Sequence, residues 1–249
     1  WVVENMYLNV FIYKMFHASP SDISVMVSAS AVVAAITTIV IGALSDRVGK
    51  RKIFMCLGYI LWGISILGFA FIKTENLGSF ARGGISAITL CISLVIVLDC
   101  IMTFFGSMAN DAAYNAWITD CGDESNRGKI EGFNSMMPLL AILVVFGGFM
   151  GLNLDETSSW TWIFCIIGVM VLLIGVTGLF LIEEKTVKST DKENTYIKNI
   201  FYSFRIKVIK ENKLLYAILL GFAIFGISIQ VFMPYLIIYY EKTLGMTNY

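Results

Sequence analysis

The sequence predicts an all-α, polytopic membrane protein, and three observations carry this prediction. First, 57% of the 249 residues are hydrophobic and only 14% are charged, whereas soluble domains average about 45–50% apolar and about 25% charged residues. Second, apolar stretches near the ~20 residues that cross ~30 Å of hydrocarbon follow one another along the chain. Third, Lys and Arg are distributed unevenly between the connections, as in multi-pass proteins.

The apolar stretches define the expected spans. A short first stretch covers 1–16, in which Trp1 already lies in apolar sequence without an initiating methionine. We therefore expect the sequence to begin inside its first helix, and to end directly after its last span, at Tyr249. Full-length spans are expected at 23–45, 53–72, 84–118, 130–152, 160–182 and 214–240.

The positive side chains predict the orientation of these spans. The loops 46–52, 120–130 and 183–213 hold 14 of the 18 Lys and Arg residues, and the remaining connections hold 4. Because positive loops stay in the cytoplasm, we expect these three loops to be cytoplasmic and the first helix to run outwards. Trp160 and Trp162 then fall at the outer boundary of the bilayer.

The longest polar connection divides the chain into three parts. Residues 1–182 are expected to form an N-terminal six-helix bundle, 183–213 a cytoplasmic linker, and 214–249 a seventh transmembrane helix. Apolar residues at helical spacing in the linker predict a basic amphipathic helix on the inner leaflet; a solvated linker with chance periodicity is the alternative. These residues are Ile197, Ile200, Phe201, Phe204 and Val208.

Several function classes are not supported by the residues. The five cysteines are scattered and mostly lie in apolar runs, so they suggest neither disulfides nor a metal site. No nucleophile–base motif, phosphate loop or nucleic-acid patch is found. We therefore expect a protein of the lipid bilayer that is not an enzyme and has no cofactor, no metal and no nucleic-acid partner. The only histidine, His17, lies in a polar connection and is not expected to handle protons.

The stretch GALSDRVGKRK at 42–52 matches a known motif. It resembles the loop motif of the major facilitator superfamily, G-x-L-x-D-R-x-G-R/K-R/K-R/K, which lies between the second and third helices. An ordinary topogenic loop is the alternative, but it would need neither the glycines nor the acid. The resemblance implies a cytoplasmic gating motif in which the acid pairs with neighbouring cations or a helix N-terminus. Its members here are Gly42, Asp46, Arg47, Gly49 and Arg51.

Further charges of the following loop could join this latch: Asp120, Asp123, Glu124, Arg127 and Glu131. The resemblance also implies a secondary active transporter of two six-helix halves that works by alternating access. The chain would then contain the N-terminal half and the start of the second half. The complementary C-terminal half would lie outside this sequence.

A second resemblance concerns GSMANDAAYNAWITDCGDESNRGK, residues 106–129. This stretch resembles the fourth helix and following loop of the glycoside–pentoside–hexuronide:cation symporter branch. The resemblance implies that Asp111 is the sugar-binding acid and Tyr114 a neighbouring aromatic. Asn110 and Asn115 complete a polar patch that can bind hydroxyl groups. First-helix residues would also face the cavity: Glu4, Asn5, Tyr7 and Asn9.

The position of Asp111 supports this assignment independently. Asp111 lies nine residues before Asp120, which at ~1.5 Å per residue places it about 13 Å deep, near the midplane. An ionisable group there costs at least ~2.5 kcal/mol unless a cavity or partner receives it. A structural hydrogen-bond network between helices is the alternative. Asp99, about 18 Å further along the helix, is expected near the outer mouth and apart from this site.

The chain departs from the branch in ways that affect coupling. Sodium-coupled members carry acids in the second helix where Ala34 and Thr38 stand here, so a proton is favoured over sodium, with Asp111 or Glu4 as its carrier. Asn134 to Met136 replace an expected basic residue, so galactoside specificity is not implied. We expect cation-coupled symport of a small polar solute, a sugar or glycoside, across the plasma membrane. The alternatives are an exporter of amphipathic compounds and a non-transporting scaffold or receptor.

Small residues and prolines predict how the helices pack. Pro138 and Pro234 are expected to kink their spans. Small side chains allow neighbouring helices to approach closely, and we expect such approaches at Ala31, Ala35, Gly42, Gly147, Gly148 and Gly151.

Overall fold

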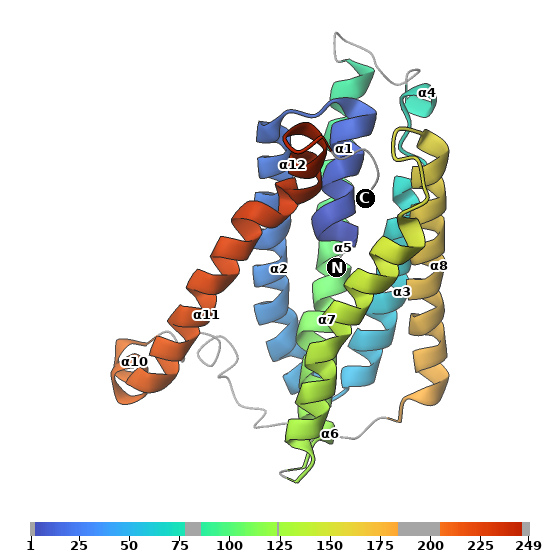
Figure 1. Cartoon of the computed structure of the whole chain (residues 1–249). Coiled ribbons are helices and arrows are strands. Elements are labelled where there is room, and N and C mark those ends of the chain that lie inside the picture. Colours follow the sequence, from blue (N-terminus) through green and yellow to red (C-terminus); the bar gives the residue numbers. More distant parts are fainter. Residues whose placement is uncertain (1–2, 78–85, 124, 184–204, 246–249) are drawn as a thin grey trace.

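The computed structural model describes residues 3–77, 86–123, 125–183 and 205–245. All regular secondary structure among these residues is helical (Figure 1). Six helical segments are long and apolar enough to cross a membrane: Pro20–Val48, Arg51–Phe69, Ala87–Cys121, Arg127–Phe149, Thr157–Leu181 and Lys213–Lys242. Each coincides with a predicted full-length span, and no boundary differs by more than three residues.

The short first span is helical from Val3 to Phe16, as a π-helical turn η1 (Val3–Tyr7) followed by α1 (Leu8–Phe16). The remaining elements are α2 (Pro20–Val48), α3 (Arg51–Phe69), α4 (Thr74–Leu77), α5 (Ala87–Gly106), η3 (Ser107–Tyr114), α6 (Asn115–Cys121), α7 (Arg127–Phe149), α8 (Thr157–Leu181), α10 (Ile206–Glu211), α11 (Lys213–Phe232), η4 (Met233–Tyr235) and α12 (Leu236–Lys242).

Local sequence explains both ends of α2. The Ser19 hydroxyl accepts a hydrogen bond from the Asp22 backbone N–H at 3.2 Å, and the Asp22 carboxylate accepts one from the Ser19 N–H at 2.8 Å. With Pro20 in the first turn, this capping box starts the helix. Gly49 ends it with a φ of 67°, a left-handed conformation that strains residues with a side chain. The second glycine of the loop motif is therefore needed for the backbone conformation that ends α2.

The most extensive contact between two described helices joins α3 and α8, and glycines make it possible. A β-carbon on Gly63 would lie 2.6 Å from the Leu172 nitrogen, and one on Gly175 would lie 2.7 Å from the Ile60 nitrogen. At Gly42, Gly147, Gly148 and Gly151, by contrast, a β-carbon would meet nothing within 4 Å in the described part of the chain. Ala31 and Ala35 are exposed. Among the described residues, close approaches are therefore not found at the predicted positions, because a small residue permits an approach but does not determine which helix face receives a partner.

An aromatic core joins the first helix to α8. The rings of Phe11 and Phe164 are 5.0 Å apart, and Trp160 lies 5.3 Å from Phe11. Trp160 is 1% exposed, and its indole N–H donates to the Leu154 carbonyl at 2.8 Å. Trp160 is thus a core residue in the first turn of α8, whereas Trp162 is 66% exposed.

The segment from α11 to α12 meets the other helices at one end and diverges from them at the other (Figure 1). Pro234 lies in the 3₁₀ turn η4, which separates α11 from α12, so the chain is irregular where a kink was predicted. Pro138 lies inside the uninterrupted helix α7.

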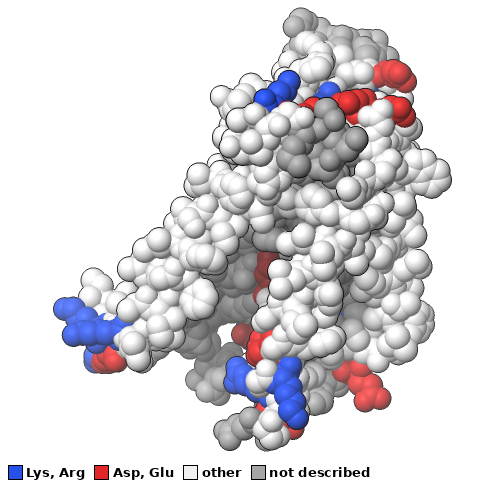
Figure 2. Space-filling view, viewed as in Figure 1, with Lys and Arg blue, Asp and Glu red and all other residues white. Residues whose placement is uncertain are grey.

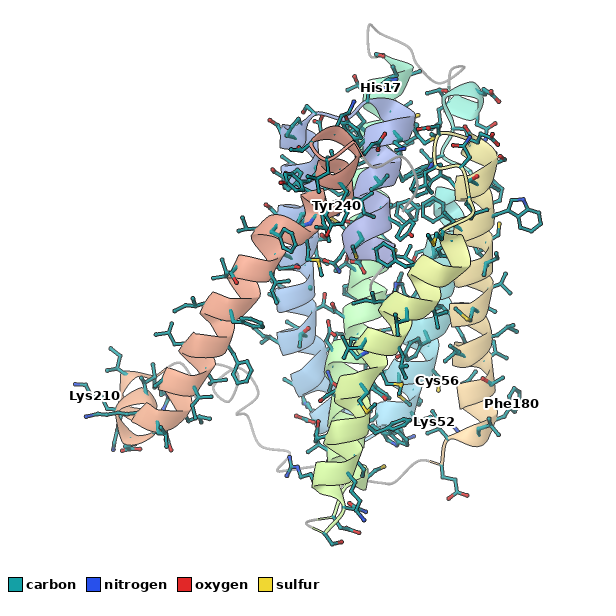
Figure 3. The ribbon with its side chains drawn as sticks, in the orientation of Figure 1. His17, Lys52, Cys56, Phe180, Lys210 and Tyr240 are labelled. Carbon is teal, nitrogen blue, oxygen red and sulfur yellow. The ribbon has the colours of Figure 1, made fainter. Side chains whose placement is uncertain are left out.

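The two ends of the bundle differ in charge. Figure 3 places Lys52 and Lys210 at one end, which we call the basic end, and His17 at the opposite end. The predicted amphipathic linker helix falls mostly on residues 184–204, which lie outside the described residues. Val208 lies in the short helix α10.

Candidate functional site

A cavity of about 110 Å³ lies between the first helix, α2, α5, η3 and α11. Figure 2 shows the hollow beside α11, with acidic atoms inside it. A cavity of this size holds several water molecules, so the polar groups on its wall can be hydrated. The longer polar side chains that line it include Glu4, Asn5, Asn9, Asp99, Asn110 and Asp111.

Two π-helical segments carry key residues of this cavity. Glu4 belongs to η1, and Asn110 and Asp111 belong to η3. At the end of η3 the Asn115 N–H donates to the Asn110 carbonyl, a five-residue spacing that widens the helix. π-Helical segments are rare in proteins, and those that occur often lie at functional sites. No sequence pattern indicated them.

Asp111 is held by a short chain of side chains. The Asn110 amide donates to Asp111 Oδ1 at 3.1 Å, and the Tyr59 hydroxyl donates to Asn110 Oδ1 at 3.3 Å. Tyr59 thereby orients the amide, and the amide orients the carboxylate. Asp111 itself is exposed to the cavity, so its second oxygen can accept a hydrogen bond from a bound molecule. Tyr59 was not predicted, because it lies in a uniformly apolar stretch.

Trp62 is a second residue that the sequence did not indicate. Its ring lies 5.7 Å from the Tyr59 ring and lines the cavity. It also covers the backbone of Gly106, where a β-carbon would be 3.0 Å from the indole. The indole Nε1 is buried and has no hydrogen-bond partner in the described part of the chain. Trp62 therefore lines the cavity with its ring, while its N–H stays buried behind the cavity wall.

The other predicted site residues lie elsewhere or at the edge. Tyr7 is 3% exposed and packs edge-on against Phe146, with 5.9 Å between centroids, which does not agree with its expected place in the cavity. The Tyr114 ring stacks on Trp117 at 6.4 Å, and Tyr114 is not among the cavity-lining residues. Asn115 donates to the Asp111 carbonyl at 3.3 Å. The structure thus brings Asp111, Asn110 and Glu4 to one cavity, but not Tyr7 or Tyr114.

Glu4 and Asp99 meet at the same cavity. Thr103 on α5 donates from its hydroxyl to Glu4 Oε1 at 2.9 Å, one turn after Asp99. The expectation that Asp99 lies apart from the site is wrong. The cavity extends along the helix axis, and the π-helical turn shortens the path between Asp99 and Asp111, so residues far apart along one helix share its wall.

The loop motif forms an ion-pair cluster at the basic end. Arg51 Nη1 lies 2.8 Å from Asp46 Oδ1, and Arg51 Nε pairs with Asp120 at the end of α6. The Arg51 side chain is only 12% exposed, whereas that of Asp46 is 61% exposed. Arg51 therefore joins the end of α2 and the start of α3 to α6. The sequence did not indicate which acid of the following loop pairs with the motif, and the structure pairs Asp120 with Arg51.

Comparison with known proteins agrees with this architecture. The family model described as Major Facilitator Superfamily matches residues 3–249. The chain belongs to the major facilitator superfamily. It is thus a multi-pass membrane transporter of that superfamily, whose members bind small solutes within the bilayer, and the predicted all-α membrane bundle is confirmed. Searches of the curated proteins and of the solved structures found no match.

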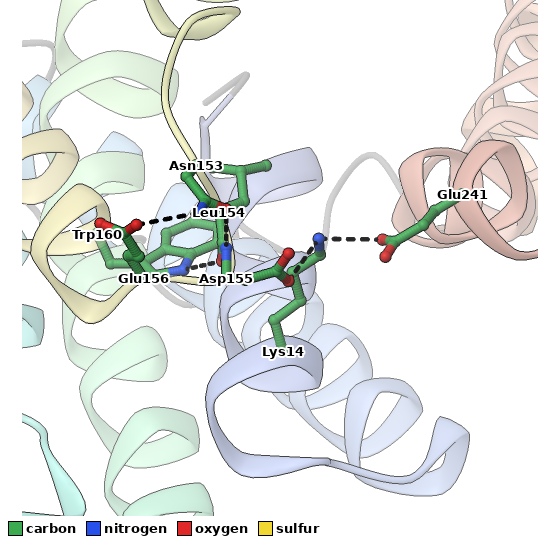
Figure 4. A network of polar contacts seen from close by, with 7 residues as sticks. All are labelled: Lys14, Asn153, Leu154, Asp155, Glu156, Trp160 and Glu241. Atoms are coloured by element: carbon green, nitrogen blue, oxygen red, sulfur yellow. Dashed lines mark hydrogen bonds and ion pairs between the residues drawn. The ribbon is translucent and has the colours of Figure 1, made fainter. Parts of the chain in front are cut away.

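The opposite end of the transporter is closed by polar contacts (Figure 4). Lys14 Nζ lies 3.0 Å from Asp155 and 3.2 Å from Glu241, so one cation joins α1, the connection before α8, and α12. The Tyr235 hydroxyl lies 2.8 Å from Ser24 Oγ. These contacts hold the end of the α11–α12 segment against α1 and α2.

Replacement of Lys14 by Met should loosen this closed end. Each of its two partly exposed ion pairs contributes about 0.2–1 kcal/mol. A cysteine at the cavity residue Val27, in a background without the five native cysteines, should therefore react about two- to thirtyfold faster. The measurement is the labelling rate with a membrane-impermeant maleimide added at that side. Lys73→Met is the matched control, because Lys73 forms no ion pair within the described residues. Equal rates in the two variants would show that Lys14 is not part of the closure.

Proposed function

We propose that this chain is the N-terminal half, with the start of the second half, of a secondary active transporter of the plasma membrane. It moves a small polar solute, a sugar or glycoside, by proton-coupled symport with alternating access. The observation that carries the proposal is the carboxylate of Asp111, oriented by Asn110, in one cavity with the ring of Trp62.

This combination suits a sugar for chemical reasons. A carboxylate and an amide accept and donate hydrogen bonds to neighbouring hydroxyls, and an aromatic face covers the apolar side of a pyranose ring. Trp62 supplies that face in place of Tyr114, whose ring is engaged with Trp117. The resemblance of residues 106–129 to sugar symporters favours the same class of solute.

The proposed direction of the cavity follows from charge. If the basic end faces the cytoplasm, as its Lys and Arg residues favour, then the cavity opens inwards, because α11 diverges from α2 and α7 towards that end (Figures 1 and 2). The contacts of Lys14 would then close the outer side. In the alternating cycle the ion pairs of Arg51 stabilise one of the two states, so they affect the exchange between states and not the solute itself.

The test uses the full-length protein in lipid nanodiscs and a panel of monosaccharides, disaccharides and aryl glycosides. At least one sugar should bind, and Trp62→Ala should weaken its binding about 2- to 12-fold, because an aromatic contact contributes about 0.5–1.5 kcal/mol beyond the area that it buries. Trp162→Ala is the matched control, since Trp162 is exposed on α8 and its replacement should leave affinity unchanged. Binding of no sugar in the panel would reject the sugar assignment.

An exporter of amphipathic compounds is the second candidate, and one observation favours it. An apolar cavity of about 60 Å³, lined by residues such as Ile66, Phe69 and Met102, shares Glu4 and Trp62 with the polar cavity. A molecule with a polar head and an apolar tail could occupy both. Amphipathic cations added to the same panel distinguish the two candidates, because they should bind more tightly than any sugar only if the exporter assignment holds.

A further inference from the structure

Two buried oxygen atoms of the cavity wall have no hydrogen-bond partner in the described part of the chain. They are Asn9 Oδ1 and Asp99 Oδ1, on side chains that belong to residues only 1% and 2% exposed. Both residues line the same cavity. Both oxygens are inaccessible to solvent, so water in the cavity does not reach them. An unpaired buried acceptor is costly, so each oxygen requires a donor or a cation that the contacts among the described residues do not supply.

The two oxygens lie at the same level of the bundle. Glu4 on the first helix is bonded to Thr103 on α5, and the two helices run in opposite directions (Figure 1). Asn9 follows Glu4 by five residues and Asp99 precedes Thr103 by four. At ~1.5 Å per residue both are displaced by about 6–8 Å in the same direction. Asn9 and Asp99 therefore face the cavity at one height.

The described side chains around Asp99 are all acidic or uncharged. Glu4 on the first helix interacts electrostatically with Asp99. Ser30 faces Asp99 from α2, and Cys100 follows it on α5. Asp111, further along the cavity, interacts electrostatically with Glu4. None of the described residues that line the cavity is Lys, Arg or His. Two neighbouring buried carboxylates do not both ionise when no cationic side chain of the described residues lies beside them, so one of them keeps a proton.

We propose that Asp99 is protonated in this conformation and donates its O–H to Asn9 Oδ1, beside an ionised Glu4. The Thr103 hydroxyl donates to Glu4 Oε1, so Glu4 already has a donor, whereas Asp99 Oδ1 has none among the described residues and is the oxygen that a proton satisfies. A protonated Asp99 satisfies both orphan oxygens at once. A transition-metal ion fits less well, since the described residues hold no group of three or more His, Cys, Asp or Glu side chains that could bind one.

This site deepens the proposed function and rests on it for its role as the coupling site, although protonation of Asp99 does not depend on which solute is carried. It separates the two tasks along the cavity. Asp99 and Glu4 handle the proton, and Asp111 with Asn110 and Trp62 handles the solute. Asp111 would then not need to be the proton carrier.

The test is infrared spectroscopy of the full-length protein in lipid at neutral pH, with the proton itself as the probe. The wild-type protein should show the C=O stretching band of a protonated carboxylic acid. Asp99→Asn should remove this band, and Asp99→Glu, a second variant should Asp99→Asn not fold, should move it to a different frequency. Asp111→Asn is the matched control and should leave the band in place.

Three outcomes would overturn the proposal. The wild-type protein could lack the band, the band could persist unchanged in the Asp99 variants, or Asp111→Asn could remove it. The sugar panel is independent of this spectrum, so failure of sugar binding and failure of the proton site are distinguishable.

Discussion

The Asp111→Asn variant is expected to bind its sugar about 10- to 150-fold more weakly while folding normally. The substitution keeps the shape of the side chain but replaces a charged acceptor by an amide that also donates. A hydrogen bond to a charged group contributes about 1.5–3 kcal/mol, which gives this range. Asp111 is exposed to the cavity, so little packing depends on it. Equilibrium binding of the sugar found in the panel, measured beside the melting temperature, checks both parts.

Asp46→Asn is the matched control for this experiment. Asp46 pairs with Arg51 at the basic end, away from the cavity. Its replacement should leave equilibrium binding nearly unchanged and slow turnover, because the ion pair affects the exchange between conformations. If Asp111→Asn left affinity within about threefold and lowered the melting temperature instead, Asp111 would be a structural hydrogen-bonding residue, and the site would lie elsewhere.

The Gly175→Ala variant is expected to lose about 1–3 kcal/mol of stability, the usual cost of overpacking a close contact. Its β-carbon would lie 2.7 Å from the Ile60 nitrogen and 3.0 Å from the Cys56 carbonyl. These are backbone atoms of α3, so the whole helix has to move. The melting temperature should fall by roughly 2–10 °C, as measured by thermal unfolding in detergent.

Gly147→Ala is the matched control, because a β-carbon there meets nothing within 4 Å in the described part of the chain. Both variants gain the same helix propensity from alanine, so the difference between them reports the close contact of α3 with α8 alone. Equal melting temperatures for the two variants would mean that α3 and α8 do not approach as closely as the structure describes.

The sequence predicts two central residues of the site, but not the full set of residues that line the cavity. Asp111 and Asn110 stood out because polar residues in a long apolar span are costly, and the structure places both at the cavity. Asp99 was assigned to a separate place by counting residues along one helix, which ignores that a cavity can extend along the axis. Tyr7 was grouped with Glu4 and Asn9 by proximity in sequence, yet its ring faces the aromatic core.

The sequence by itself determined the spans and the uneven placement of positive charge, because the thickness of the bilayer and the cost of burying charge act on each segment separately. The loop motif also indicated the superfamily. Only the tertiary structure decided which helix faces meet. In a membrane helix the faces towards lipid and towards protein are both apolar, so periodicity does not separate them. For this reason Trp62, Tyr59 and Gly175 emerged only when the helices were packed together.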